Sequence, residues 1–215
     1  MGQRILIFGP QGSGKGTQAE LIARRHGLPY ISTGDIFRYH RQQQTELGKK
    51  IEQYISSGQL VPDELTNEMV KERLAQPDCL AGFVLDGYPR TQSQLEFLDT
   101  ITGIDHAVVI NLSDQEAIER LAGRLACVCG LSYHLTFSPP EKPGRCNKCG
   151  NKLFRRDDDQ PAAIKQRLAI YHRETEPVFA ILKKRGRQID VDGSESIEGV
   201  FNQIEDALSH DSQAL

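Results

Sequence analysis

The chain has 215 residues, of which 38% are hydrophobic and 26% are charged, and its formal net charge is −3. That length suits one domain, or one core with a small insert, and it can bury a core without disulfide bonds. The composition excludes an integral membrane protein and does not favour disorder. The near balance of charge gives no overall basic field of the kind that attracts nucleic acid. Since no targeting signal is visible, we expect a cytoplasmic protein. We also expect it to be a monomer that binds neither nucleic acid nor membranes.

Five short apolar runs predict the strands of a buried sheet, over residues 4–8, 28–32, 83–86, 106–112 and 188–191. Helical patterns between them predict helices, over residues 17–26, 35–57, 62–75, 113–125, 161–185 and 197–209. Ser113 and Glu116 have the spacing of a capping box, and Pro177 is expected to kink its helix. Pro62 and Pro161 suit the first position of a helix. Strands that alternate with helices are typical of a parallel sheet covered on both faces.

The segment 127–154 interrupts this alternation. It is rich in proline and glycine, and polar and apolar residues alternate around 133–137. A small β insert between two helices is therefore expected there.

Four of the five cysteines lie in this insert, as Cys127-Val-Cys129 and Cys146-Asn-Lys-Cys149, with sixteen residues between the pairs. Such paired spacing is typical of a structural zinc site with four thiolate ligands. The alternative is four reduced thiols in a segment that is held by its own packing. Cys79 stands alone and is expected to be simply buried.

The most specific motif is Gly9-Pro-Gln-Gly-Ser-Gly-Lys15-Gly-Thr17, which follows a predicted strand and opens a predicted helix. Its glycines let consecutive backbone N–H groups curl around a phosphate, and the helix N-terminus adds its positive dipole end. Lys15 supplies a mobile positive charge toward the β- and γ-phosphates. The usual P-loop has a hydroxyl residue directly after the lysine, whereas here Gly16 precedes Thr17. The motif predicts binding of a nucleoside triphosphate, by an ATPase, a switch GTPase or a kinase.

Several polar residues follow the ends of predicted strands, where ligands bind in open α/β sheets. Arg38 and Arg90 can hold a phosphate bidentately there. The amide of Gln94 can pair with N6–H and N1 of adenine together. Asp86 ends an apolar strand and can hold Mg²⁺ through water. Asp35 has a simpler alternative role, which is to cap the helix that follows it.

Taken in order, these motifs resemble those of the adenylate kinase family. The matching segments are the phosphate loop, Thr33-Gly-Asp-Ile-Phe-Arg38, the stretch from Ser57 to Glu64, and Asp86-Gly-Tyr-Pro-Arg90 followed by Gln94. The resemblance runs from about residue 4 to about residue 205. It implies an α/β P-loop fold of three layers around a central five-stranded parallel sheet. It also implies a core domain (1–31, 62–122 and 161–215), a helical lobe that binds the nucleoside monophosphate (32–61) and a small β lid (123–160).

The same resemblance implies reversible, Mg²⁺-dependent transfer of the terminal phosphoryl group of ATP to AMP, giving two ADP. It implies five catalytic cations: Lys15, Arg90, Arg124, Arg156 and Arg167. The ATP contacts that it implies are Gly12, Ser13, Gly14, Lys15, Gly16, Thr17, Arg120, Arg124, Ser132, Tyr133 and Glu195. The AMP contacts that it implies are Thr33, Arg38, Gln59, Leu60, Val61, Gly87, Tyr88, Pro89, Arg90, Gln94, Arg156 and Arg167. Asp86 is expected to hold Mg²⁺ through water.

At the start of the predicted lid, Arg120 and Arg124 are four residues apart and are expected to share one face of the helix over 113–125. The insert is similar to the zinc-bearing lids of bacterial family members, which implies structural Zn²⁺ on Cys127, Cys129, Cys146 and Cys149. One departure is that the first pair is C-x-C, whereas the family has C-x-x-C. His134 is expected to be a packed lid residue rather than a chemical group.

Three alternative functions remain open. A UMP/CMP-type nucleoside monophosphate kinase would share the chemistry and differ in the acceptor base. A P-loop switch or ATPase that acts on a protein partner would leave Arg38, Arg90 and Gln94 without a role. A zinc-ribbon module that binds nucleic acid would use the basic residues of the insert, which are Lys142, Arg145, Lys148, Lys152, Arg155 and Arg156.

Overall fold

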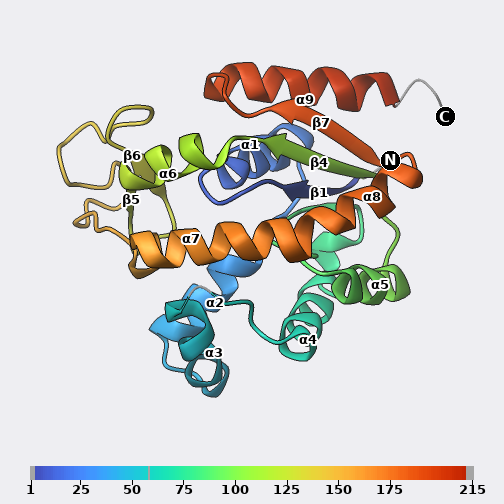
Figure 1. Ribbon diagram of the computed structural model, residues 1–215, viewed down its shortest axis with the longest axis horizontal. Coiled ribbons are helices and arrows are strands. Elements are labelled where there is room, and N and C mark those ends of the chain that lie inside the picture. Colours follow the sequence, from blue (N-terminus) through green and yellow to red (C-terminus); the bar gives the residue numbers. More distant parts are fainter. Residues whose placement is uncertain (1–2, 58, 212–215) are drawn as a thin grey trace.

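A five-stranded parallel sheet forms the centre of the molecule (Figure 1). The computed structural model describes residues 3–57 and 59–211, so the predicted domain bounds at residues 1 and 215 lie outside the described residues. In spatial order the strands are β2 (Tyr30–Ser32), β3 (Phe83–Asp86), β1 (Arg4–Phe8), β4 (His106–Asn111) and β7 (Gln188–Asp192). Each neighbouring pair is parallel. The predicted sheet is confirmed, with strand ends shifted by one or two residues.

Helices cover both faces of this sheet. Because successive strand residues point in opposite directions, β1 sends Ile5 and Ile7 to one face and Leu6 and Phe8 to the other. The first face packs against α1 (Lys15–His26) and α9 (Ile197–Asp211). The second face packs against α4 (Asp63–Leu74), α5 (Gln92–Ile101) and α8 (Glu176–Lys184). The predicted three-layered α/β fold is therefore confirmed. Among the helices of the described residues, none has the length and apolar character of a membrane span.

The prediction of one helix over 35–57 is wrong, because two helices lie there, α2 (Thr33–Gln42) and α3 (Glu46–Ser56). The chain turns between them at Gln44, which has a positive φ of 48°. Thr45 then caps α3 by accepting a hydrogen bond from the Gly48 N–H at 3.0 Å. At Gly48 a Cβ atom would collide with the carbonyl of His40, so only glycine lets the two helices approach this closely. Together α2 and α3 project away from the sheet (Figure 1).

A second correction concerns the helix predicted over 113–125. The structure has α6 (Asp114–Ala122), and then β5 (Arg124–Ala126), which pairs antiparallel with β6 (Ser132–His134). The capping box of Ser113 and Glu116 at the start of α6 is confirmed. The helix ends beside Gly123, where a Cβ atom would collide with the ring of His134. Arg124 thus lies on a strand, so the expectation that it shares a helix face with Arg120 is wrong.

Proline sets two further boundaries. Pro161 begins α7 (Pro161–Ile170), as predicted. Pro177 lies in the first turn of α8, directly after a π-helical segment, η3 (Tyr171–Thr175), so the predicted interruption of this long helix is confirmed. Pro62 differs from its prediction, because it is the cap residue before α4 rather than the first helical residue. Two short 3-10 helices complete the described chain, η1 (Pro77–Cys79) and η2 (Asp157–Asp159).

Candidate active site

The loop between β1 and α1 forms the base of the site. Gly12 and Gly14 have positive φ values of 93° and 85°, and a Cβ atom on Gly12 would lie 2.7 Å from the carbonyl oxygen of Ala117. These positions therefore need glycine, as the sequence predicts. Gly14 is the cap residue of α1, and Lys15 is its first helical residue. The loop consequently aims backbone N–H groups and a helix N-terminus at one point, which is the geometry of an anion site.

Lys15 lies among other cations at this point. Its Nζ donates to the carbonyl oxygen of Pro10 at 3.2 Å. Enclosure by the protein lowers the pKa of Lys15 to about 8. Asp86 opposes that shift, whereas Arg90, Arg167 and Arg124 add to it. A bound polyanion would relieve this crowding of positive charge, so the site is prepared for a ligand with several negative charges.

Asp86 ends β3 beside the phosphate loop and is buried. Its Oδ2 accepts a hydrogen bond from the Tyr30 hydroxyl at 3.2 Å, and burial together with this carboxylate raises the pKa of Tyr30. The Oδ1 atom has no hydrogen-bond partner among the residues that the structure describes. A buried, unpaired carboxylate oxygen next to a phosphate site fits a hydrated Mg²⁺, which prefers oxygen ligands and keeps its waters. The predicted role of Asp86 is compatible with this geometry.

Two cavities adjoin at the carboxyl ends of the strands. One is an open cleft with about 570 Å³ of free space, part of it continuous with solvent, and is lined by parts of α2, α3 and the segment 59–61. The other is a similar cleft with about 540 Å³ of free space and is lined by the phosphate loop, including Lys15. Arg90, Arg167, Gly87 and Leu60 line both cavities. Two separate ligands could therefore meet at the same pair of guanidinium groups.

The first cavity contains most of the predicted acceptor residues, namely Arg38, Gln59, Leu60, Val61, Gly87, Arg90, Gln94 and Arg167. Thr33 donates to the carbonyl oxygen of Gly87 at 3.0 Å, which fixes the turn after β3. Tyr88 is buried with its hydroxyl near the carbonyl oxygen of Gln94 at 3.0 Å, and Pro89 lines the second cavity. These two residues support the cavity wall.

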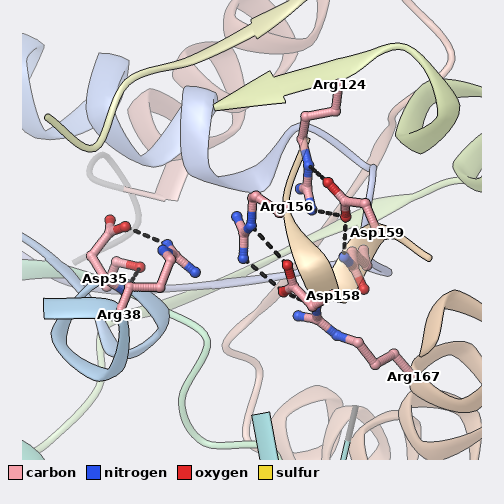
Figure 2. A network of polar contacts seen from close by, with 9 residues as sticks. Asp35, Arg38, Arg124, Arg156, Asp158, Asp159 and Arg167 are labelled. Carbon is pink, nitrogen blue, oxygen red and sulfur yellow. Dashed lines mark hydrogen bonds and ion pairs between the residues drawn. The ribbon is translucent and has the colours of Figure 1, made fainter. Parts of the chain in front are cut away.

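Arg38 and Asp35 lie at the edge of this cavity. Helix α2 is capped by Ser32, whose Oγ accepts a hydrogen bond from the Asp35 N–H at 3.2 Å, so Asp35 is not the cap residue. The Asp35 carboxylate instead pairs with the Arg38 guanidinium (Figure 2). Arg38 is therefore held near the cavity by an ion pair that a ligand phosphate could replace.

Three predicted arginines converge on two adjacent carboxylates (Figure 2). Arg156 donates to Asp158 through two bonds of 2.9 and 2.8 Å, and Arg167 pairs with the same carboxylate. Arg124 forms a two-point pair with Asp159, which also accepts from the Gln11 side chain of the phosphate loop at 3.0 Å. The guanidinium groups are thereby oriented without a ligand.

These pairs are largely enclosed, since the Asp158 side chain is 11% exposed and that of Asp159 is 4% exposed. Burial alone would raise the pKa of Asp158, but Arg156, Arg167 and Arg124 outweigh it and hold that pKa well below its usual range. Burial also lowers the pKa of Arg167 to about 10, although Asp158 opposes the shift. The site thus concentrates positive charge that two carboxylates only partly neutralise.

The residues expected near the donor base are less closely gathered. Arg120 donates to the Ser194 carbonyl at 3.4 Å, beside Glu195, and its guanidinium lies 5.6 Å from the ring centre of Phe137. Ser132 and Glu195 are exposed. His134 packs against Phe137, with ring centres 4.5 Å apart, in agreement with its expected packing role.

Tyr133 points into the cysteine cluster instead. Its side chain is 8% exposed, and its hydroxyl lies 3.3 Å from the Sγ of Cys146 and accepts from the Asn147 N–H at 2.8 Å. The Tyr133 ring thus packs with the cysteine cluster, and the predicted ATP contact of this residue stays a prediction.

The four cysteine sulfurs of the insert lie within 4.8 Å of one another. The Sγ–Sγ distances are 3.3 Å between Cys127 and Cys149 and 3.6 Å between Cys129 and Cys146. Thiolates about 2.3 Å from one tetrahedral zinc ion are roughly 3.8 Å apart, so the cluster fits zinc. The shortened first pair still reaches the cluster because Gly130 turns the chain with φ +92°. The Tyr133 hydroxyl and backbone N–H groups lower the pKa of Cys146 to about 6, which favours a thiolate ligand.

Sequence reasoning missed several residues of this site. Asp158 and Asp159 organise the arginines, and Asp63 holds the Gln94 side chain at 2.7 Å. The acidic run at 157–159 directly after two arginines is a signal that could have identified the first two. Asp63 lies in the stretch from Ser57 to Glu64 that the motifs single out, but its partner is 31 residues away in the chain, so the spacing does not reveal the pair. As expected, Cys79 is buried, and an Arg73 Nη1 lies 2.9 Å from its sulfur.

A phosphate loop that shares its cavity wall with a second, arginine-lined cavity is the arrangement of a P-loop kinase whose acceptor is a nucleoside monophosphate. The sequence profile of the adenylate kinase family matches residues 7–187. The chain belongs to the adenylate kinase family, and the relatives described below do not favour the UMP/CMP-type alternative.

Curated relatives match almost the whole chain. The adenylate kinases of Symbiobacterium thermophilum and Methanothrix thermoacetophila are 46% and 45% identical to it over 210 residues, covering 95% of this chain and 97% and 98% of theirs. The adenylate kinase of Clostridium botulinum (strain Langeland) is 46% identical over 214 residues, covering 97% of this chain and 99% of its own.

Proposed function

We propose that this chain transfers the terminal phosphoryl group of ATP to AMP, reversibly and with Mg²⁺, giving two ADP. Its cellular role would be nucleotide balance and AMP salvage, by a cytoplasmic monomer. The observation that carries the proposal is the pair of cavities that share Arg90 and Arg167, one against the phosphate loop and one against α2 and α3. A triphosphate in one cavity and a monophosphate in the other would bring their phosphates to the shared wall.

Transfer of a phosphoryl group needs positioning and charge neutralisation more than it needs a nucleophilic side chain. Lys15 and the loop N–H groups of residues 12–17 would hold the donor phosphates. Arg90, Arg156 and Arg167 would hold the acceptor phosphate and the equatorial oxygens of the transferring group. Arg124 would approach the same group from the lid side.

The Asp158 carboxylate would then accept the hydrogen bonds that a substrate phosphate would otherwise accept. In the structure it accepts from Arg156 and Arg167 and keeps both guanidiniums near the shared wall. A phosphate offers these arginines more charge and more acceptor oxygens than a carboxylate does. Substrate binding would therefore redirect arginines that are already in place, at little cost in ordering.

Two metal ions accompany the proposed reaction. Mg²⁺ bound with ATP neutralises phosphate charge, and Asp86 would hold it through water, as its unpaired Oδ1 suggests. Zn²⁺ on Cys127, Cys129, Cys146 and Cys149 would be structural only, because four thiolates leave no open position on the ion.

The test is an assay of ATP with each of AMP, CMP, UMP and GMP, alongside the variant Lys15→Ala. We expect AMP to be the preferred acceptor, and we expect Lys15→Ala to lower the rate on the order of 10³-fold in a folded protein. ATP hydrolysis without an acceptor should stay slow, because enclosure of the site excludes water. Preference for another monophosphate, or normal activity of the folded variant, would refute the proposal.

A further inference from the structure

The side-chain amide of Gln94 is held at both of its ends. Gln94 lies in the first turn of α5, is 2% exposed and lines the cavity proposed for the acceptor. Its Oε1 accepts a hydrogen bond from the backbone N–H of Arg90 at 2.7 Å. Its Nε2 donates to Oδ1 of Asp63 at 2.7 Å. The Oε1 atom therefore has one lone pair left for a ligand, and Nε2 has one N–H left.

These two partners exclude the reversed orientation of the amide. A backbone N–H can only donate and a carboxylate can only accept, so the atom facing Arg90 must be oxygen and the atom facing Asp63 must be nitrogen. Turning the amide by 180° would place two donors together at one end and two acceptors together at the other. Two buried hydrogen bonds would be lost in that turn, and the buried polar groups would be left unsatisfied.

Asp63 is itself fixed in place. It is the first residue of α4, where a carboxylate is stabilised by the helix dipole. Its Oδ2 accepts from the Thr91 hydroxyl at 2.9 Å. Thr91 also caps α5 by accepting from the Gln94 N–H at 3.1 Å. If the carboxylate turned away from Gln94, it would also give up its hydrogen bond with Thr91, the cap residue of α5.

We propose that Asp63 is a positioning residue that sets the acceptor specificity of the site by fixing which way the Gln94 amide faces. The fixed amide presents one free N–H and one free oxygen lone pair to the cavity. Adenine offers the matching pair, an N6–H donor beside an N1 acceptor. A 6-keto purine such as hypoxanthine offers the reverse, an O6 acceptor beside an N1–H donor, and is rejected because the amide cannot turn. This inference rests on the proposed function, in which AMP is the acceptor.

The same logic separates amino from keto pyrimidines. Cytosine carries an amino group beside a ring acceptor, as adenine does, whereas uracil carries the keto pattern. Asp63 therefore accounts for amino over keto selection and not for purine over pyrimidine selection, which depends on the size of the cavity.

The decisive variant is Asp63→Asn, tested by the ratio of kcat/KM for AMP to that for IMP. An asparagine can accept or donate toward Gln94, so the reversed amide loses one of its two penalties. We expect the AMP-over-IMP ratio to fall about tenfold or more, by improved use of IMP, with an unchanged KM for ATP. The control is Asp99→Asn, which removes a carboxylate from the same helix as Gln94 but from an exposed ion pair with Arg185. Its ratio should equal that of the wild type.

An unchanged ratio in a folded Asp63→Asn protein would overturn the proposal. If that variant does not fold, side-chain amide NMR of the wild type decides instead. The two Nε2 protons of Gln94 should exchange with solvent at least tenfold more slowly than those of exposed Gln92 on the same helix, and equal exchange would overturn the proposal. A wild type that does not phosphorylate AMP would refute the proposed function alone, because the amide protons report on Asp63 without any substrate.

Discussion

Lys15 illustrates how one residue can make substrate binding depend on pH. Its ammonium binds phosphate only when protonated, and its pKa in the free protein is lowered to about 8 by enclosure. As pH rises through 8, the fraction of charged Lys15 falls. Bound triphosphate stabilises the charged form and moves the pKa upward again. The loss of charge should consequently affect capture of ATP more than it affects the bound complex.

We therefore expect kcat/KM for ATP to decline above about pH 8, while kcat holds to a higher pH. Profiles of both constants between pH 6 and 10 would measure this. Binding of ATP by Lys15→Arg between pH 6 and 9 is the control, since a guanidinium keeps its charge over that range and should show no decline. A kcat/KM profile that stays level to pH 9.5 in the wild type would contradict the assignment.

The residues that sequence reasoning missed share a physical cause. A carboxylate inside a phosphate site is unexpected, because it competes with the ligand for the same donors. Asp158 is nevertheless useful there, since unpaired guanidiniums that are buried together would repel one another. The acidic run at 157–159 signals such residues in the sequence. Which arginines they hold depends on the side chains that converge in space, and the spacing does not reveal that.

At the scale of elements, Gly48 decides where two helices separate. Helical periodicity alone continues through 35–57, because α2 and α3 are joined by only three residues. The close approach of Gly48 to the His40 carbonyl replaces that single helix with a packed pair. Tertiary contact overrode local pattern here, as it did where Gly123 ends α6 beside His134.

Gly48→Ala should push α2 and α3 apart and disturb the wall of the acceptor cavity that Phe37 and Ile55 form. We expect KM for AMP to rise severalfold, KM for ATP to stay within twofold, and stability to fall by about 1–3 kcal/mol. Gly103→Ala is a suitable control, because nothing lies within 4 Å of its Cβ position. Equal KM values for AMP in the two variants would show that this contact does not shape the cavity.

The predicted lid needs a different source of stability from that of the helix pair. Its apolar cluster consists of few residues around Cys127 and Cys146, and β5 and β6 are each three residues long. So small a unit needs a further source of stability, and a structural metal is the usual one. A chelator that removes Zn²⁺ should lower the melting temperature of the protein and loosen the lid. The fold around the phosphate loop should stay intact.

Elemental analysis of protein purified without chelator, combined with thiol titration, measures the metal directly. One equivalent of Zn²⁺ and one reactive thiol at most, that of Cys79, are expected in the native protein. Cys79→Ala is the control that leaves the cluster untouched. Less than a tenth of an equivalent of any transition metal, with four titratable thiols in the lid, would contradict the zinc site.

Across the whole molecule, the sequence predicts the sheet, its layers and the phosphate loop, because each follows from a local pattern with a physical cause. Motifs at strand ends predict a set of acceptor residues, and the structure gathers most of this set in one cavity. Their role as acceptor contacts stays a prediction. The sequence does not predict how distant segments meet. The contact of α3 with η2, and the pairing of Asp159 with both Gln11 and Arg124, arise only from the folded arrangement. The division into core, lobe and lid stays a prediction.

The position of β7 has a consequence for synthesis of the chain. This strand occupies the edge of the sheet beside β4, yet 76 residues (112–187) separate the two in sequence. Until β7 emerges from the ribosome, β4 presents an unpaired edge whose central residues, 107–110, are apolar, and α9 has not yet covered its face. Exposed edges of this kind recruit other chains. A chain that stopped before β7 would therefore be prone to aggregation. This would hold although all proposed active-site residues that precede residue 188 were already present in it.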